Sequence, residues 1–216
     1  MFTDQNQIKI LIADDHVLIR EGLKKILRGA PDLVVVSEAQ NGQEVLDNTK
    51  NQKVDVVVLD ISMPGKSGLD VLKDLKQEHP ALPVLILSMH PEDRFATRSL
   101  KAGAAGYLTK ECAADELIRA IRRVVAGRKY VSTTLSEKLA LQLETDTGKP
   151  PHEMLSNREY QVLCMIAAGK KAKDIANELS LSVNTINTYR ARILEKMKMT
   201  NDAELIRYAL QNRLVE

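Results

Sequence analysis

Residues 54–65 read Val-Asp-Val-Val-Val-Leu-Asp-Ile-Ser-Met-Pro-Gly, and this stretch decides the fold. We expect a strand from Val54 to Leu59, because β-branched residues dominate it and only Asp55 is polar. A run with so few polar residues is typical of a central strand that is buried on both faces of a parallel sheet. The run ends at Asp60, and Met63-Pro64-Gly65 then predicts a turn. The stretch therefore predicts a strand that places one carboxylate at the edge of a buried sheet.

Four further apolar runs lie on either side of this strand. They are Ile8 to Ala13, Val34 to Ser37, Val84 to Leu87 and Gly106 to Leu108. Between the runs, apolar residues recur at helical spacing and form stripes that can cover a sheet. The stripes comprise Ile19, Leu23, Ile26 and Leu27; Val71, Leu72 and Leu75; and Leu117, Ile118, Ile121, Val124 and Val125. Strands that alternate with helices predict an α/β domain with a parallel sheet.

The length and composition of the chain limit its class. Its 216 residues indicate two domains, and 44% hydrophobic with 28% charged residues predicts a soluble globular protein rather than a disordered one. Aromatic residues make up only 3%, which argues against an aromatic platform for carbohydrates or single-stranded nucleic acid. We find neither a secretory signal nor an apolar run long enough for a membrane helix. Two distant cysteines, Cys112 and Cys164, agree with a reducing compartment, so we expect a cytoplasmic protein.

The second half of the chain has only helical periodicity. Ser156-Asn157-Arg158-Glu159 predicts a capping box at the start of a helix that Gly169 ends. Further helices are expected over Ala172 to Leu179, Val183 to about Met197 and Asn201 to Asn212. A polar, proline-containing stretch separates the two halves. We therefore predict a first domain over residues 1–128, a linker over 129–150 and an all-α four-helix domain over 151–216.

Polar residues follow four of the predicted strands at their carboxyl ends. Asp14 and Asp15 follow the first strand, Asp60 the third and Ser88 the fourth, and Lys110 lies just beyond the fifth strand. Ligands of parallel sheets gather at this edge, and a strand order of 2-1-3-4-5 makes the first and third strands neighbours. The three carboxylates then converge and require a cation. Oxygen ligands that leave room for water and a phosphate oxygen favour Mg²⁺.

This combination of side chains indicates phosphoryl transfer to a carboxylate. Asp60 can attack a phosphorus atom and form an acyl phosphate, while Lys110 pairs with the phosphoryl oxygens and Ser88 donates a hydrogen bond. A strand-end Asp can instead cap the next helix, but capping does not explain polar residues after four strands at once. Gly65-Lys66-Ser67 resembles the end of a P-loop, yet an aspartate stands where that motif needs glycine, which excludes a nucleotide site. His16 is interpreted as a helix-start residue.

The first domain resembles the receiver domain of two-component response regulators over residues 1 to about 128. The resemblance rests on Asp14-Asp15, Asp60 with Met63-Pro64-Gly65, Ser88, Tyr107 and Lys110. It implies a flavodoxin-like (βα)₅ fold and a sensor histidine kinase that phosphorylates the aspartate after the third strand. Many receivers have proline directly after the lysine, but Glu111 stands here, so a cis peptide is not expected at this joint.

The same resemblance implies roles for single residues. The implied metal ligands are Asp15, Asp60 and the Ser62 carbonyl, with Asp14 assisting through water. Ser88 and Tyr107 are implied to report phosphorylation: the hydroxyl group moves toward the phosphoryl group, and the aromatic ring follows into the vacated space. Spacing alone leaves plain packing open as the role of Tyr107.

The second domain has helix-turn-helix spacing. Ile175-Ala176, Leu179, Leu181-Ser182 and Thr185-Ile186 describe two helices joined by a tight turn, in which Ser180 replaces a common glycine. Residues 154–200 hold eight basic and four acidic side chains, a local charge of +4. We expect the second helix to enter the major groove of double-stranded DNA. The predicted DNA-contacting residues are Lys173, Ser182, Asn184, Thr185, Asn187, Thr188, Arg190, Ala191, Arg192 and Lys196.

This domain resembles the LuxR-type output domain of the NarL/FixJ subfamily of response regulators over residues 151–216. The resemblance rests on Leu155-Ser156-x-Arg158-Glu159, Gly169, Asp174-Ile175-Ala176, Leu181-Ser182 and Thr185-Ile186. It implies a homodimer, when phosphorylated or on DNA, to which Leu205, Ile206 and Ala209 contribute. Core packing explains these three residues equally well. RNA polymerase is a further candidate partner.

Together these features predict a transcription regulator in which phosphorylation of Asp60 switches sequence-specific DNA binding. Such a protein accepts and loses a phosphoryl group but is not a turnover enzyme. Three alternatives stay open: an orphan regulator that ignores phosphorylation, an RNA-binding or protein-docking second domain, and a small phosphatase. For the helical domain, a plain four-helix bundle with a solvated basic face is the simplest alternative.

Overall fold

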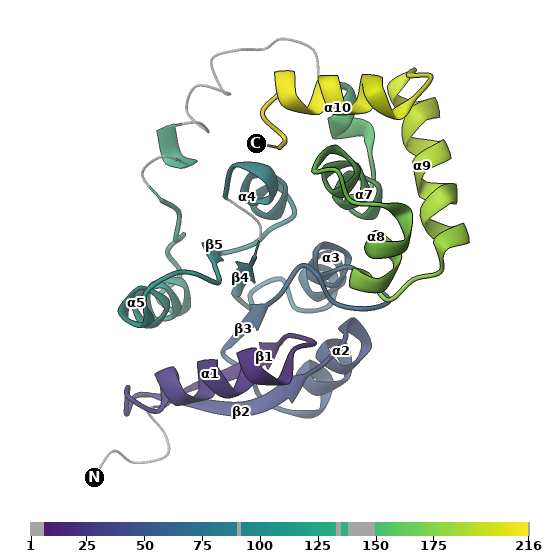
Figure 1. Cartoon of the computed structure of the whole chain (residues 1–216). Helices are drawn as coiled ribbons and strands as arrows, with labels where there is room; N and C mark the ends of the chain where they lie inside the picture. The colour runs from purple at the N-terminus through teal and green to yellow at the C-terminus, as the bar shows by residue number, and fades with distance from the viewer. Residues whose placement is uncertain (1–6, 90–91, 133–134, 138–149, 216) are drawn as a thin grey trace. The chain divides into compact units, whose positions relative to one another are not determined.

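A computed structural model describes residues 7–89, 92–132, 135–137 and 150–215 of the chain (Figure 1). The chain divides into two compact units, Met1–Ala140 and Leu141–Glu216. Within the described residues, the first unit combines strands and helices and the second contains only helices. The greater part of the predicted linker, residues 129–150, lies outside the described residues.

A parallel five-stranded sheet forms the centre of the first unit (Figure 1). Its strands are β1 (Ile8–Ala13), β2 (Leu33–Ala39), β3 (Val56–Leu59), β4 (Val84–Ser88) and β5 (Gly106–Thr109). The strand order is β2-β1-β3-β4-β5, which confirms the predicted order and the flavodoxin-like fold. Ala13 pairs with Leu59 in the register, so the next residues, Asp14 and Asp60, leave neighbouring strands at the same edge.

Four described helices connect the strands, namely α1 (Val17–Leu27), α2 (Gly42–Asn51), α3 (Gly68–Glu78) and α4 (Glu92–Lys101), and α5 (Ala114–Val125) follows the last strand. Leu27 of α1 and Ile121 of α5 belong to one buried cluster with Ile10, Ile12 and Val58 of the sheet. Full burial of one such side chain contributes about 1.5–3 kcal/mol. This core fixes the sheet and therefore the edge from which the polar residues emerge.

The observed limits of four strands differ from the predicted ones, and β4 and β5 each end one residue later than predicted, at Ser88 and Thr109. β2 extends over Leu33–Ala39, longer than the predicted 34–37, and β3 starts at Val56 rather than Val54. At the entry to β3, the Asp55 carboxylate accepts a hydrogen bond from the backbone N–H of Lys9 (2.8 Å). The Asp55 N–H in turn donates to the Lys9 carbonyl (2.8 Å). Asp55 therefore anchors the beginning of the strand instead of lying within it.

The chain that follows α5 returns along β5. The Tyr130 N–H donates to the carbonyl of Ala105 (2.9 Å), and the Tyr107 N–H donates to the carbonyl of Tyr130 (3.3 Å). Gly106 lies between these two bonds, and a Cβ atom there would come within 2.7 Å of the Tyr130 carbonyl oxygen. Glycine permits this close approach. The Tyr130 hydroxyl group donates to Glu116 of α5 (3.1 Å), so the segment is fixed to the sheet and to the helix.

The described part of the second unit consists of η2 (Pro151–Met154), α7 (Asn157–Ala167), α8 (Ala172–Glu178), α9 (Val183–Met197) and α10 (Asp202–Gln211). α7 starts at the predicted capping box, in which Ser156 accepts from the Glu159 N–H (3.3 Å) and Glu159 accepts from the Ser156 N–H (2.7 Å). Gly169 follows α7 with φ +80°, the left-handed conformation that was predicted there. α9 packs against both α7 and α8.

The turn between α8 and α9 has no glycine. Ser180 adopts φ 52° in this turn, a left-handed conformation that side chains disfavour. The Leu181 N–H donates to the Ala176 carbonyl (2.8 Å), which closes the turn. Ser182 then caps α9, because its hydroxyl oxygen accepts from the Thr185 N–H (3.1 Å). The structure thus confirms the predicted helix-turn-helix.

Candidate functional site

Three charged side chains from three strand ends meet at the carboxyl edge of the sheet. The Lys110 ammonium group lies 2.6 Å from Asp14 Oδ2 and 2.9 Å from Asp60 Oδ2. All three side chains are buried, with 5% of the Lys110 side chain and 2% of each Asp side chain exposed. The predicted convergence of these residues around one pocket is therefore observed.

Burial changes the acid–base properties of this trio. Burial raises the pKa of the Asp60 carboxyl group, and the neighbouring Asp14 adds to the increase, although Lys110 opposes both. Burial by itself lowers the pKa of Lys110, but attraction to the two carboxylates outweighs it and the pKa is raised. Lys110 therefore stays a cation, and one ammonium group faces several carboxylates.

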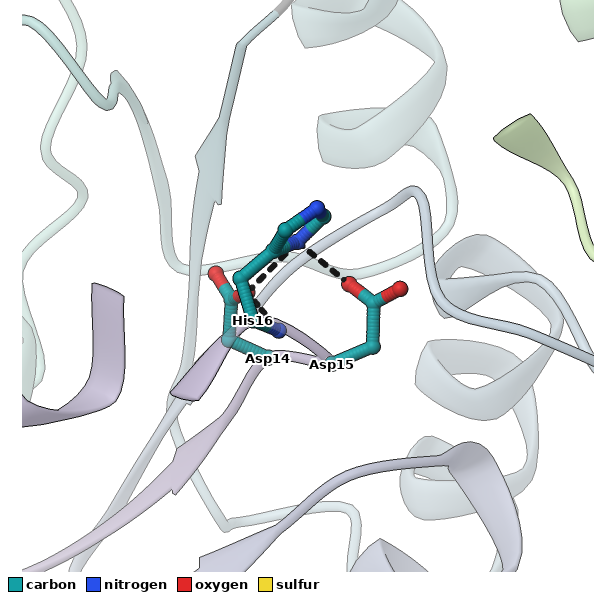
Figure 2. A group of neighbouring side chains, drawn as sticks. All are labelled: Asp14, Asp15 and His16. Carbon is teal, nitrogen blue, oxygen red and sulfur yellow. Dashed lines mark hydrogen bonds and ion pairs between the residues drawn. The ribbon is translucent and has the colours of Figure 1, made fainter. Parts of the chain in front are cut away.

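Asp15 and His16 lie beside Asp14 (Figure 2), and both are more exposed than the buried trio of Asp14, Asp60 and Lys110. His16 Nδ1 lies 2.8 Å from Asp15 Oδ1 and 3.4 Å from Asp14 Oδ1, and these three residues form a group whose ligand atoms lie within 4.8 Å of one another. As predicted, His16 also starts a helix, because it is the N-cap residue of α1. Asp60 Oδ1 is buried and has no hydrogen-bond partner among the described residues. An acceptor in this state suits a cation or an incoming electrophile.

The remaining predicted residues of this pocket lie close in the fold. Ser88 is the last residue of β4 and is fully buried, and its carbonyl accepts from the Lys110 N–H (2.8 Å). Tyr107 in β5 is also fully buried, so it is not a surface-edge residue. Ser62 follows β3 in the loop after Asp60 and is half-buried.

The loop after β3 turns back sharply toward Asp60. The Gly68 N–H donates to the Ile61 carbonyl (3.0 Å), and a Cβ atom at Gly68 would overlap the Asp60 carbonyl oxygen. Ser67 accepts from the Asp70 N–H (3.3 Å) and so caps α3. The close return explains why glycine stands at this position, which the sequence pattern did not single out.

The pattern also missed a buried arginine. The Arg20 guanidinium group of α1 donates to the carbonyl oxygen of Asp14 (2.7 Å) and to the Glu38 carboxylate of β2 (3.1 Å). Only 7% of the Arg20 side chain is exposed. A charged residue among the apolar positions of α1 is the one sequence signal for such a contact, since charged side chains are rarely buried without a partner.

In the second unit, one face of α9 is apolar and the opposite face is open to solvent. Ile186, Ile193 and Met197 are buried on the inner face. Seven predicted DNA-contacting residues are exposed along the helix, namely Asn184, Asn187, Thr188, Arg190, Ala191, Arg192 and Lys196. Lys173 of α8 is exposed as well. An exposed face with amide, hydroxyl, methyl and guanidinium groups matches the chemistry of base edges and phosphates.

Several predicted contact residues have partners within the unit. Arg190 Nε lies 2.6 Å from an Asp202 carboxylate oxygen at the start of α10. Lys196 Nζ lies 2.6 Å from Glu159, whose carboxylate is 97% buried in the capping box of α7. The Ser182 and Thr185 hydroxyl groups bond each other (2.8 Å). These side chains therefore help to hold α9 in place, and the pairs of Arg190 and Lys196 were not predicted from the sequence.

The proposed dimer residues differ in exposure. Leu205 and Ala209 are fully buried, and α10 packs against α7, so core packing accounts for these two residues. The prediction that Leu205 and Ala209 contact a second chain is therefore wrong for this structure, because a fully buried side chain offers no area to a second chain. Ile206 is partly exposed, and Leu210 has 49% of its surface exposed.

Family comparisons agree with this geometry. Residues 10–122 match the response regulator receiver domain, and residues 153–209 match the bacterial regulatory proteins of the luxR family. The chain belongs to the response regulators of the NarL/FixJ subfamily, which combine a receiver domain with a LuxR-type DNA-binding domain. Neither matched domain belongs to a classical enzyme family.

Individual relatives extend over nearly the whole chain. Response regulator GacA of Pseudomonas syringae pv. syringae (strain B728a) is 40% identical over 210 residues, 97% of this chain and 98% of the relative. Response regulator UvrY of Escherichia coli (strain K12) is 36% identical over 208 residues, 96% of this chain and 95% of the relative.

Solved structures are also similar. RcsB from Salmonella enterica serovar Typhimurium, bound to promoter rprA in the presence of phosphomimetic BeF3−, has a TM-score of 0.64 and 25% identity. The match covers 94% of this chain and 98% of that one. The response regulator ChrA of a heme-sensing two-component system has a TM-score of 0.53 and 30% identity over 97% of this chain and 100% of that one. Within the described part of this chain, no helix has the length and apolar character needed to span a bilayer.

Proposed function

We propose that Asp60 accepts a phosphoryl group from a sensor histidine kinase and that this event switches DNA binding by the second unit. The observation that carries the proposal is the contact of Lys110 with both Asp14 and Asp60 at the carboxyl edge of the sheet (2.6 and 2.9 Å). A buried carboxylate beside a fixed ammonium group is suited to hold a transferred phosphoryl group, because the ammonium group compensates the new charge.

The proposed reaction exchanges one bond to phosphorus for another. A carboxylate oxygen of Asp60 attacks the phosphorus atom of a phosphohistidine, the O–P bond forms, the P–N bond breaks, and the histidine leaves with the bonding electrons. Lys110 then pairs with a phosphoryl oxygen, and the Ser88 hydroxyl group donates to another. In this proposal the Tyr107 ring follows the serine hydroxyl group. Because Asp60 is a single acceptor, one chain holds one phosphoryl group at a time. Attack of water on the acyl phosphate later releases inorganic phosphate and restores the carboxylate, which resets the switch.

A divalent cation fits the donor set of this pocket. The buried Asp60 Oδ1, which lacks a hydrogen-bond partner among the described residues, and the oxygen donors around it are the ligand type that Mg²⁺ prefers. Asp15, Asp60 and the Ser62 carbonyl would hold the ion, with Asp14 acting through water. When bound, Mg²⁺ supplies positive charge that lowers repulsion between the carboxylates and the phosphoryl group.

The second unit would bind double-stranded DNA through the exposed face of α9. A homodimer, formed on phosphorylation or on DNA, would place two such helices on the two halves of a pseudo-palindromic site. This role, with RNA polymerase as a further partner, places the protein in the bacterial cytoplasm, where the chromosome lies.

The phosphoacceptor role is tested by treating the full-length chain with acetyl phosphate and Mg²⁺ and measuring its intact mass. We expect one added phosphoryl group per chain, and none in Asp60→Asn. Asp55→Asn is the matched control, because Asp55 directly precedes the same strand at its opposite end and bonds the Lys9 backbone. A phosphoryl group on the Asp60→Asn variant, or no phosphoryl group on the wild type, would overturn the assignment of Asp60 as the phosphoacceptor. Continuous release of inorganic phosphate at many turnovers per chain would indicate a phosphatase instead.

The output role is tested with the same treated samples in gel shifts on genomic duplex fragments. We expect phosphorylation to strengthen salt-sensitive binding to some sequences in the wild type and to leave Asp60→Asn unchanged. Equal binding with and without phosphorylation would identify an orphan regulator. No preference for any duplex sequence would point to RNA or protein as the ligand of the second unit.

A further inference from the structure

The buried guanidinium group of Arg20 bonds the backbone of the acidic pocket at Asp14. Arg20 Nη1 donates to the carbonyl oxygen of Asp14 (2.7 Å), and Arg20 Nε donates to Glu38 Oε2 (3.1 Å). Arg20 lies in α1, Asp14 directly follows β1, and Glu38 lies in β2. One side chain thus connects three elements at the point where the chain leaves β1.

The far end of this connection is itself fixed. Lys24 Nζ lies 2.6 Å from Glu38 Oε1 and 2.5 Å from Glu21. The Lys24 hydrogen bond holds the pKa of the Glu38 carboxyl group below its usual range, and the Arg20 bond acts in the same direction. Glu38 therefore remains ionised at neutral pH and presents one oxygen to each cation. Two separate cations on one carboxylate make a firm anchor for the guanidinium group.

The near end of the connection holds a peptide group of the pocket. The Asp14 N–H donates to the Ala39 carbonyl (3.1 Å), its Oδ1 accepts from the His16 N–H (2.9 Å), and its Oδ2 contacts Lys110. The bond from Arg20 completes this set by fixing the Asp14 carbonyl. That carbonyl belongs to the peptide joining Asp14 to Asp15, so its direction also fixes the position of the Asp15 Cα atom, from which the carboxylate side chain extends.

We propose that Arg20 is a positioning residue for the cation site: it holds the peptide between Asp14 and Asp15 so that the Asp15 carboxylate faces the pocket. This inference rests on the cation site of the proposed function. Groups that orient metal ligands without touching the metal typically change metal affinity about 10–100-fold when they are removed.

The charge of Arg20 and its positioning role predict opposite changes of Mg²⁺ affinity when Arg20 is removed. Arg20 is a cation beside a cation site, so its charge alone weakens metal binding, and removal of that charge alone would tighten it. If Arg20 instead positions the Asp14–Asp15 peptide, its removal weakens metal binding in spite of the lost repulsion. The direction of the change therefore separates the two roles.

The test measures the Kd of Mg²⁺ for the full-length chain by isothermal titration calorimetry, at a temperature well below the onset of unfolding. We expect Arg20→Met to bind Mg²⁺ about 10-fold more weakly than the wild type. Arg20→Lys keeps the charge but cannot hold both oxygen partners, so it should also bind more weakly. Arg122→Met is the matched control, because it removes the same charge from an exposed pair with Asp32 (2.7 Å) and should leave the Kd unchanged.

Other outcomes would contradict either the positioning role of Arg20 or the cation site itself. Tighter Mg²⁺ binding by Arg20→Met would show that only its charge matters, and an unchanged Kd with a lower melting temperature would show a purely structural role. If Arg20→Met does not fold, Arg20→Lys carries the comparison, and an unchanged Kd in that variant overturns the proposal. A wild type that binds no Mg²⁺ would overturn the cation site of the proposed function instead.

Discussion

The acidic pocket of the first unit and the recognition helix of the second present their functional groups in contrasting ways. The pocket collects Asp14, Asp60 and Lys110 from three strand ends that are up to 96 residues apart, and it buries them. The recognition helix α9 presents its groups from 15 consecutive residues, most of them open to solvent. A buried charge needs a partner, so the fold itself specifies the pocket. An exposed helix face tolerates many sequences, and partners within the unit decide which of its side chains remain available.

The largest effect that sharpens this contrast is expected at Lys110. Lys110→Met leaves Asp14 and Asp60 buried without their ammonium partner, and removal of one partner of a buried ion pair costs about 3–5 kcal/mol of folding stability. Hydrogen exchange measured by mass spectrometry in β1, β3 and β5 reports this loss. Added Mg²⁺ should recover part of it, because the ion replaces the missing positive charge.

Lys50→Met provides the control for this measurement. Lys50 pairs with Glu78 (3.1 Å) on the surface of the same unit, where ion pairs contribute at most about 1 kcal/mol. Equal effects of the two substitutions would contradict the claim that burial makes the pocket special.

Substitution of Lys196 is expected to give the next largest effect on stability. Like Lys110, and unlike its neighbours on α9, Lys196 pairs with a buried carboxylate. Its partner Glu159 is buried, so Lys196→Met should destabilise the second unit by about 1.5–3 kcal/mol, the contribution of a hydrogen bond to a charged group. Lys170→Met is the control, since Lys170 and Glu178 form an exposed pair. Hydrogen exchange in α7 and α9 measures both. A weaker DNA complex with unchanged stability would instead identify Lys196 as a phosphate contact.

The Lys196 effect should also depend on pH. Burial raises the pKa of the Glu159 carboxyl group, but hydrogen bonds from Lys196 and Ser156 outweigh burial and the pKa is lowered. A lowered carboxylate pKa contributes stability that is complete above the ordinary value of 4.5 and is lost as the pH falls through the folded-state pKa. The wild type and Lys196→Met should therefore converge in stability in acid, and a constant difference down to low pH would contradict the ion pair.

Two arginines on α9 test the exposed face itself. Both arginines are exposed, but Arg190 also pairs with Asp202, so Arg192→Ala should weaken duplex binding more than Arg190→Ala. A lost base contact costs about 1–3 kcal/mol, and a lost phosphate contact reduces the slope of log K against log salt by about 1. Gel shifts at several salt concentrations distinguish these cases. Unchanged affinity in both variants would remove α9 as the recognition helix.

The smallest effect concerns the turn that aims α9. Ser180 holds a left-handed conformation that costs a non-glycine residue about 1–2 kcal/mol. Glycine loses more conformational freedom on folding, which offsets about 0.5–1 kcal/mol of the relief. Ser180→Gly should therefore raise the stability of the second unit by about 0.5–1 kcal/mol, as measured by hydrogen exchange. Ser180→Ala keeps the strain, and a gain of stability in that variant would contradict the explanation.

The contrast also explains which features could be predicted from the sequence. The strands have apolar runs with sharp polar ends, so their positions could be predicted from the sequence, and general rules of parallel sheets place the polar residues that follow them at one edge. The strand order itself came from the resemblance to receiver domains. α2 and α4 have mostly polar sequences and left no apolar stripe to detect. The role of Arg20 depends on the distance between α1 and β2, which no spacing rule supplies. For the same reason, the pairing of Lys196 with Glu159 was not apparent, since 37 residues separate them.

The hydrogen bonds of Tyr130 have a mechanical consequence. The same backbone that carries Tyr107 also holds the departing chain, because the Tyr107 N–H donates to the Tyr130 carbonyl and Tyr130 donates to Ala105. A displacement of β5 at Tyr107 cannot leave the starting point of the interdomain tether unchanged. Two backbone hydrogen bonds thus couple the strand that carries Tyr107 to the segment at Tyr130, from which the chain continues toward the second unit.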